Sequence, residues 1–205
     1  MSYSAEIIPQ SNIWASSTDT TTLRQKLLDL LCQVAYKEGD FTLSSGQPST
    51  YYINCKPVTL DPQGALATGR LLLSMLPTGT GAVAGLTLGA DPIVSAVSVV
   101  SAYENQPIPG LIIRKEAKGH GTQAYIEGPS LPVGTNIVVL EDVVTTGQSA
   151  MKAVTRLRDA GYTVNRVISL LDRKQGGGEF YKSQKLEFQA VFNIEEIQQR
   201  YQQIK

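Results

Sequence analysis

The chain has 205 residues, 42% of them hydrophobic, and its 18 basic and 18 acidic side chains give a formal net charge of zero. This length suits one domain with a sizeable core, and the neutral balance argues against a general attraction to nucleic acid or anionic membranes. The N-terminus carries no basic and apolar secretory signal, and no apolar run approaches the ~20 residues of a membrane span, so we expect a cytoplasmic protein.

Cysteine and histidine are too scarce for several common chemistries. With Cys32, Cys55 and the single His120, the chain lacks the roughly four closely spaced ligands of a structural zinc site. Two cysteines make no disulfide framework, and we expect Cys32 to be a buried free thiol. The sequence also has no G-x-S-x-G elbow, no G-x-G-x-x-G fingerprint and no Walker A loop, which disfavours serine hydrolases, Rossmann enzymes and P-loop hydrolases.

The N-terminal part is predicted to be a loose arm followed by a helix. Residues 1–18 show no clear period and contain several Ser, Thr, Asn and Pro, which is typical of an irregular segment. Leucines and a valine then recur at helical spacing from Leu23 to Val34. Asp19 or a following threonine is placed to cap this helix, and Gly39 is placed to stop it.

Helices and strands alternate through the rest of the chain. Further helices are predicted over about 62–75, 92–103, 148–160 and 194–204. Strands are predicted over 51–54, 82–86, 111–114, 137–140, 165–171 and, as an edge strand, 188–192. This order predicts an α/β fold with a mostly parallel central sheet and helices on both faces. Ligands of such sheets bind beyond the carboxyl ends of the strands, here the loops after Leu86, Arg114, Leu140 and Leu171.

The loop after Leu86 contains small residues directly before a predicted helix. Gly89 and Ala90 allow a ligand to approach the backbone closely, and the dipeptide Asp91-Pro92 is a favourable helix start. We interpret this loop as a backbone cradle for an anionic group such as pyrophosphate. The alternative is an ordinary connection between a strand and a helix.

The most basic segment of the chain is RKEAKGHG, residues 114–121. It holds three permanent cations and the only histidine within seven residues of an otherwise neutral protein, and Gly119 and Gly121 make it mobile. A mobile, positively charged segment of this kind suits a lid over a polyanion, whose developing charge the cations would stabilise. The alternative is a solvated charged face.

The segment Ile137–Ala150, IVVLEDVVTTGQSA, combines an apolar strand with acids, hydroxyls, glycine and a helix start. Backbone N–H groups and the positive end of the helix dipole favour a phosphate there. Glu141 and Asp142 are placed to accept hydrogen bonds from sugar hydroxyls. We therefore predict a sugar-phosphate site. The alternative is a plain turn in which Asp142 or Thr145 caps the helix.

Four motifs in this order carry a family resemblance. The string over 137–150 resembles the 5-phosphoribosyl 1-diphosphate (PRPP) signature of type I phosphoribosyltransferases. The string over 114–121 is similar to the mobile catalytic loop of orotate phosphoribosyltransferases, residues 41–54 resemble their orotate-side segment, and residues 171–173 resemble their D-R motif. The resemblance spans roughly residues 23–192.

The resemblance implies an architecture and a reaction. The chain would be a type I phosphoribosyltransferase domain over 19–205, with a small N-terminal hood from about 19–60 and the C-terminal segment. It would transfer the 5-phosphoribosyl group of PRPP to orotate, giving orotidine 5′-monophosphate and pyrophosphate in pyrimidine biosynthesis. Mg²⁺ would be held mainly through PRPP, and the protein would be a homodimer with shared active sites that binds neither nucleic acid nor membranes.

The resemblance also implies residue roles. The expected catalytic residues are Lys118, His120 and Asp142. The expected PRPP-binding residues are Arg114, Lys115, Lys118, His120, Glu141, Asp142, Val143, Val144, Thr145, Thr146, Gly147, Gln148 and Ser149. The expected orotate-binding residues are Thr145, Arg173, Tyr52 and Ile53. The alternatives are a phosphoribosyltransferase for another base and a non-catalytic regulator that keeps the fold and binds PRPP or RNA.

The chain departs from the family pattern at a few positions. Ser44 and Gly89 stand where some relatives carry lysine, Asn54 stands where many have aspartate, and Glu141 replaces the more common first aspartate of the acidic pair. The acidic pair keeps its charge, whereas one cationic contact to orotate or pyrophosphate would be missing at Ser44.

Overall fold

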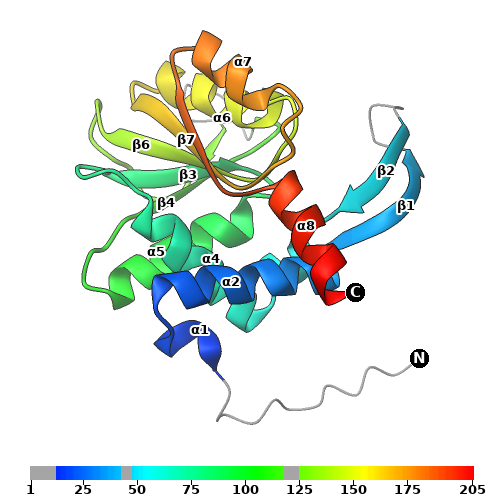
Figure 1. Cartoon of the computed structure of the whole chain (residues 1–205). Coiled ribbons are helices and arrows are strands. Elements are labelled where there is room, and N and C mark those ends of the chain that lie inside the picture. Colours follow the sequence, from blue (N-terminus) through cyan, green and yellow to red (C-terminus); the bar gives the residue numbers. More distant parts are fainter. Residues whose placement is uncertain (1–12, 43–47, 118–124) are drawn as a thin grey trace.

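A computed structural model describes residues 13–42, 48–117 and 125–205 of the chain. Its centre is a six-stranded sheet with the order β5-β4-β3-β6-β7-β8, in which only the β4–β5 pair is antiparallel (Figure 1). The strands are β3 (Ala82–Leu86), β4 (Gly110–Ile113), β5 (Ile126–Glu127), β6 (Asn136–Val144), β7 (Thr163–Asp172) and β8 (Glu187–Asn193). The predicted α/β fold with a mostly parallel sheet is confirmed.

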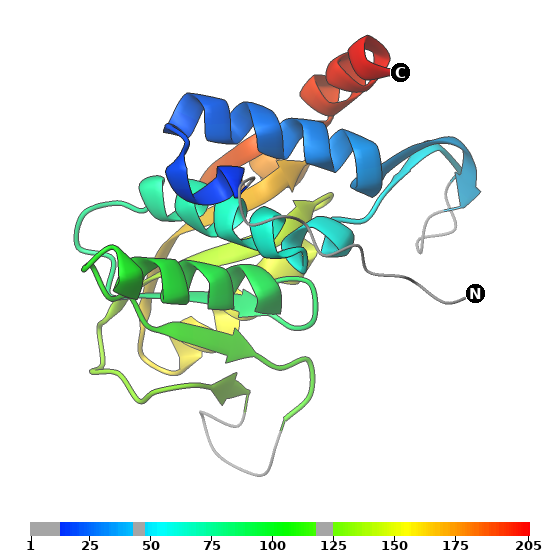
Figure 2. The same cartoon turned by 90° about the horizontal axis from the view of Figure 1, so that it is seen from below.

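Alternate side chains of the central strands serve two separate cores. In β6, Val138 and Leu140 contribute to the core shared with α2, α4 and α5, while Ile137 and Val139 contribute to the core under α6. Because both faces are covered, these strands read as continuous apolar runs. The helices of the first core cover one face of the sheet (Figure 2), and α6 and α7 cover the other (Figure 1).

Four helices begin and end close to their predicted positions: α4 (Pro62–Ser74), α5 (Asp91–Tyr103), α6 (Gln148–Asp159) and α8 (Ile194–Ile204). The others are α2 (Thr20–Leu30), which was predicted to run further, and the shorter α1 (Trp14–Ser17), α3 (Lys56–Thr59) and α7 (Gly177–Ser183), which were not predicted. The carboxylate of Asp61 accepts hydrogen bonds from the Gln63 and Gly64 N–H groups at the start of α4. In the described part of the chain, none of these helices combines the length and the apolar character that crossing a bilayer requires.

The first long helix differs from its prediction at its C-terminal end. Asp19 caps α2 as expected, accepting hydrogen bonds from two N–H groups. The helix then widens into a π turn, Leu31–Ala35, and β1 (Tyr36–Thr42) follows at once and pairs antiparallel with β2 (Pro48–Ile53). Gly39 therefore lies inside a strand, and the prediction that it stops the helix is wrong. The cause is tertiary: Tyr36 pairs with Ile53 before a helix stop is reached.

Part of the expected loose arm is packed onto the domain. Residues 14–17 form the short helix α1, in which Ala15 is fully buried. The Trp14 N–H donates to Gln63 Oε1 at 2.9 Å, and Arg70 Nη1 donates to the Ala15 carbonyl at 2.8 Å. Both partners lie on α4, so tertiary hydrogen bonds order a stretch that shows no sequence period. Residues 1–12 lie outside the described residues.

The C-terminal helix packs against the N-terminal part of the chain. Its capping box at Asn193 and Glu196 starts α8, and Arg200 pairs with Asp29 of α2 at 2.7 Å. The Tyr201 ring meets the Tyr36 ring edge-on, with centroids 5.0 Å apart. Figure 1 shows α8 beside α2, with the β1–β2 ribbon projecting from the body on the same side.

Candidate active site

The sheet order brings the expected functional loops to one edge. β3 pairs with β4 and β6, and β6 pairs with β7, all in parallel, so their carboxyl ends point the same way. β6 is longer than predicted. Its ladder with β7 continues from Glu141, opposite Ser169, to Val144, opposite Asp172, so the two acids lie within the strand and not after it.

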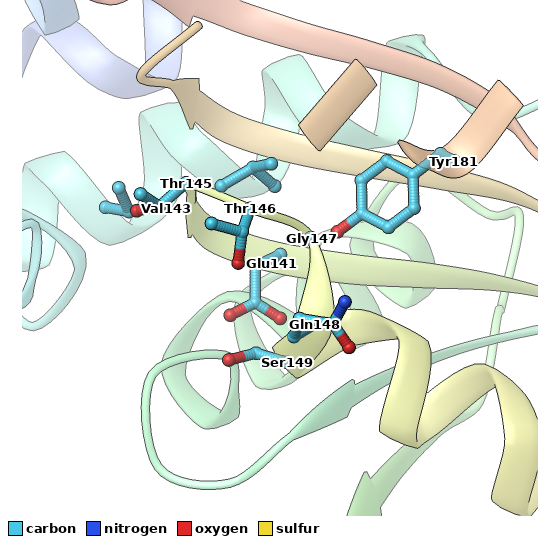
Figure 3. Close-up of a pocket in the computed structure, with 9 residues that line it drawn as sticks. Glu141, Val143, Thr145, Thr146, Gly147, Gln148, Ser149 and Tyr181 are labelled. Atoms are coloured by element: carbon cyan, nitrogen blue, oxygen red, sulfur yellow. The ribbon is translucent and has the colours of Figure 1, made fainter. Parts of the chain in front are cut away.

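A cavity of about 70 Å³ lies where β6 turns into α6 (Figure 3). A single water needs only about 10–15 Å³ of such volume, so the cavity has room for a larger polar group. It is lined by Glu141, Val143, Val144, Thr145, Thr146, Gly147, Gln148, Ser149 and Tyr181. All the lining residues except Tyr181 were predicted to bind a ligand.

The N-terminus of α6 opens toward this cavity without a side-chain cap. Its N-cap residue is Gly147, which has no side chain and adopts a left-handed conformation with φ +85°. Neither Asp142 nor Thr145 caps the helix, so the cap that the plain-turn alternative assigned to them is absent. The first N–H groups of α6 and its dipole are left for an anion.

Close packing makes a glycine necessary at position 147. An ideal Cβ there would lie 2.9 Å from the Phe180 ring and 3.0 Å from the Tyr181 ring. Those rings belong to α7, which the sequence did not predict. The buried Tyr181 hydroxyl has no hydrogen-bond partner among the described residues. Burial raises the pKa of Tyr181, so this hydroxyl stays a proton donor at neutral pH.

The two acids of β6 lie in a desolvated environment. Glu141 is 7% exposed, and its Oε2 has no hydrogen-bond partner within the described part of the structure. Burial, followed by the charge of Asp142, raises the pKa of Glu141 to about 8, although the charge of Lys115 acts in the opposite direction. Burial also raises the pKa of Asp142, whose Oδ1 accepts a hydrogen bond from the Val143 N–H at 2.9 Å.

The loop after β3 faces the second acid. An ideal Cβ on Gly89 would lie only 2.6 Å from Asp142 Oδ1, so the backbone of this loop approaches the carboxylate as closely as glycine allows. The charge of Lys56, the first residue of α3, partly offsets the rise in the pKa of Asp142. Lys56 was not predicted, because α3 follows β2 closely and carries no motif.

A buried cation lies at the end of β7, beside the same turn. Arg173 is 9% exposed, and its backbone N–H donates to the Val144 carbonyl at 2.9 Å. Its Nε donates to the Tyr51 hydroxyl at 3.0 Å, and the guanidinium lies 4.7 Å from the Tyr51 ring centroid. Its Nη2 has no hydrogen-bond partner among the described residues and is thus a free donor for a ligand.

The structure sets Tyr51, not the predicted Tyr52, beside Arg173. Alternation along β2 buries Tyr51 and leaves Tyr52 44% exposed, where it contacts the Phe41 ring. Ile53 is half-buried and packs against the core. The double tyrosine was a visible signal, but which of the two points inward depends on the pairing of β2 with β1.

The basic segment is described only in part. Arg114 pairs with Glu127 of β5 at 3.1 Å and is not among the residues that line the cavity, and Lys115 is exposed. Lys118 and His120, two of the expected catalytic residues, lie outside the described residues. Within the described parts of the chain, no group of three or more His, Cys, Asp or Glu side chains could hold a metal by itself.

Comparisons with known proteins agree with this geometry. No family model matches the chain. An orotate phosphoribosyltransferase of Nostoc sp. is 74% identical over 204 residues, which cover 100% of this chain and 99% of the relative. The crystal structure of Mycobacterium tuberculosis orotate phosphoribosyltransferase in complex with Fe(III) dicitrate has a TM-score of 0.76 at 34% identity, covering 85% of this chain and 98% of that one. The Mycobacterium tuberculosis structure in complex with PRPP has a TM-score of 0.71 at 30% identity, covering 86% and 99%.

The raised pKa of Glu141 makes stability depend on pH. Between its ordinary value of 4.5 and about 8, the folded protein holds a proton that the unfolded chain has released. The free energy of unfolding should therefore fall as pH rises through this range and level off above it. We expect denaturant unfolding from pH 5 to 8.5 to show a steeper fall for the wild type than for Glu141→Gln. Exposed Glu179→Gln is the control, and equal slopes for Glu141→Gln and the wild type would contradict the assignment.

Proposed function

The chain belongs to the orotate phosphoribosyltransferase family of glycosyltransferases, which act in pyrimidine biosynthesis, and on that premise we propose how its site receives PRPP and orotate. The observation that carries the proposal is the cavity at the uncapped start of α6, directly beside two buried carboxylates. A ligand that combines a phosphate with sugar hydroxyls suits this pair of features. The similarity to a structure described in complex with PRPP supports it.

The 5′-phosphate of PRPP would lie in the cavity. Residues 143–149 would surround it, with backbone N–H groups and the Thr145, Thr146 and Ser149 hydroxyls as donors. The hydroxyl of Tyr181 adds a further buried donor on the α7 side. The helix dipole of α6 favours the negative charge.

Glu141 and Asp142 would bind the ribose hydroxyls. Glu141 Oε2 accepts no hydrogen bond among the described residues, and Asp142 Oδ1 accepts one from the Val143 N–H. Both buried carboxyl groups can therefore accept hydrogen bonds from ribose hydroxyls. The charge on Asp142 would also stabilise the positive charge that develops at C1′ of the ribose, which is the catalytic role we propose for this residue.

The donor set fits Mg²⁺ held mainly through the substrate. Hard carboxylate oxygens suit this ion, but two adjacent acids supply too few ligands, and Mg²⁺ commonly keeps waters and substrate phosphates as its other ligands. When bound, the ion would neutralise charge on the departing pyrophosphate.

The pyrophosphate would lie between the Gly89 loop and the basic segment. Arg114 and Lys115 leave β4 at the same edge of the sheet, and Lys115 is close enough to Glu141 to influence its pKa. We propose that Lys118 and His120 complete this cluster of cations. Their role is electrostatic, and proton donation by His120 ranks below it.

Orotate would bind against Arg173. A guanidinium with a free Nη2 donor suits a planar ring that carries a carboxylate and carbonyl oxygens. Tyr51 would orient the guanidinium, Thr145 would face the ring from the phosphate loop, and Ile53 remains a candidate for the pocket wall. In the reaction, the bond from C1′ to the pyrophosphate oxygen breaks and a bond from C1′ to the orotate nitrogen forms. No covalent enzyme nucleophile is needed.

We also propose a homodimer with shared active sites, acting in the cytoplasm. Leu88, Val99 and Tyr103 are 64%, 71% and 88% exposed, which suits burial against a second copy of the chain. Cys32 and Cys55 are both free thiols, as is usual in a reducing compartment. Residues 19–60 and α8 would form the hood beside the site.

The base specificity can be tested directly. Purified protein with PRPP and Mg²⁺ is offered orotate, uracil, adenine and hypoxanthine, and the consumed base and released pyrophosphate are measured. We expect orotate alone to be consumed, because Arg173 offers its charge to a carboxylate. Turnover of a neutral base instead would support the first alternative function. PRPP binding without turnover of any base would support the regulator.

The role of Tyr51 can be separated from that of its neighbour. Tyr51→Phe removes the hydroxyl that accepts the Arg173 Nε hydrogen bond, and we expect the KM for orotate to rise about ten-fold, the usual scale for a hydrogen bond to a charged group. Tyr52→Phe is the matched control on the same strand and should leave this KM unchanged. Equal values for the two variants would argue against an orotate site at Arg173.

Shared active sites can be tested with hybrid dimers. Lys118→Ala and Asp142→Asn should each fold normally and lose at least about a hundred-fold in kcat. After the two proteins are mixed and allowed to exchange subunits, activity should return to roughly a quarter of the wild-type value, because half of the dimers are hybrids with one intact site of two. No recovery, with exchange verified by mass spectrometry, would mean that each basic segment serves its own subunit.

A further inference from the structure

Two arginines of α6 bind backbone carbonyls in different parts of the chain. Arg158 donates from Nε at 3.1 Å and from Nη2 at 2.6 Å to the Val164 carbonyl, which ties the helix to the strand that follows it. Arg156 instead reaches a segment more than forty residues earlier. It donates from Nη1 to the Arg114 carbonyl and from Nη2 to the Lys115 carbonyl, the latter at 2.9 Å.

Arg156 makes a third contact at the other end of the same segment. Its guanidinium carbon lies 4.1 Å from the centroid of the Tyr125 ring. The Arg114 N–H donates to the Tyr125 carbonyl at 2.8 Å, so the two ends are also joined by a backbone hydrogen bond. One half-buried side chain thus contacts both ends of the stretch 115–125.

The geometry of these contacts constrains the direction of side chains. Two donors of one rigid, planar guanidinium bind two successive carbonyls, which fixes the peptide planes on both sides of Lys115. Once those planes are fixed, the direction of the Lys115 Cα–Cβ bond is fixed as well. A lysine in place of Arg156 has a single flexible ammonium group and cannot hold both planes in this way.

We propose that Arg156 is a positioning residue that aims Lys115 at the pyrophosphate of PRPP. The inference rests on the proposed function, which assigns this cation to the pyrophosphate. Arg156 itself does not line the cavity at the start of α6, and it acts through the backbone that it binds. Lys115 follows the end of β4, at the same carboxyl edge of the sheet where the acidic pair of β6 lies.

The test compares Arg156→Lys with Arg158→Lys. Both changes keep the charge and remove an arginine-to-carbonyl anchor from the same helix, so similar decreases in Tm are expected. Only Arg156→Lys should weaken PRPP binding, measured by calorimetry without orotate, and lower kcat/KM for PRPP by about ten-fold or more, the scale of small misplacements of binding groups. If the kinetic constants of the two variants agree, Arg156 is only a structural brace and the proposal fails.

A double-mutant cycle tests whether Arg156 acts through Lys115. Lys115→Ala should weaken PRPP binding by itself, and adding Arg156→Lys should then cost less than the product of the two separate effects. If the double variant loses as much PRPP affinity as the two single effects multiplied together, the proposal fails. It also fails if Lys115→Ala binds PRPP normally. Failure of the wild-type protein to bind PRPP is a different result, because it would overturn the proposed function before any variant is compared.

Discussion

Parallel pairing of β6 with β3 on one side and β7 on the other is the constraint on which the rest of the structure depends. It buries the middle of the strand, Ile137–Leu140, on both faces, and the acids Glu141 and Asp142 follow toward its carboxyl end. The same pairing delivers the Gly89 loop and Arg173 to that end. Desolvation of the acids and convergence of the loops therefore have one cause.

The fold was predictable where short-range patterns decide it. Segments rich in apolar residues identified β3 and β7, and the dipeptide Asp91-Pro92 marked the start of α5 within one residue. Predictions failed where distant contacts decide. Gly39 entered a strand because Tyr36 pairs with Ile53, and α7 escaped notice because Tyr181 is held by packing against the α6 turn, which no local pattern records.

The candidate site, too, was predictable where a local motif carries it and not where distant contacts decide. Residues 141–149 were predicted together because one continuous motif carries both the acids and the phosphate loop. Which of Tyr51 and Tyr52 points inward depends on the register of β2 with its partner strand β1, which the sequence does not reveal. Arg156 could not be predicted at all, since a surface arginine on a helix gives no sign that it binds carbonyls of residues 114 and 115.

The protonation of Glu141 has a consequence for how a polyanion enters the site. With a pKa of about 8, this carboxyl is mostly neutral in the ligand-free protein at pH 7, so the entrance carries one negative charge fewer than its composition suggests. An approaching diphosphate would meet less repulsion, and a cation or a hydroxyl donor that arrives there would lower the pKa and favour the carboxylate. Ligand capture is thereby coupled to proton release, and its heat will vary with the ionisation enthalpy of the buffer.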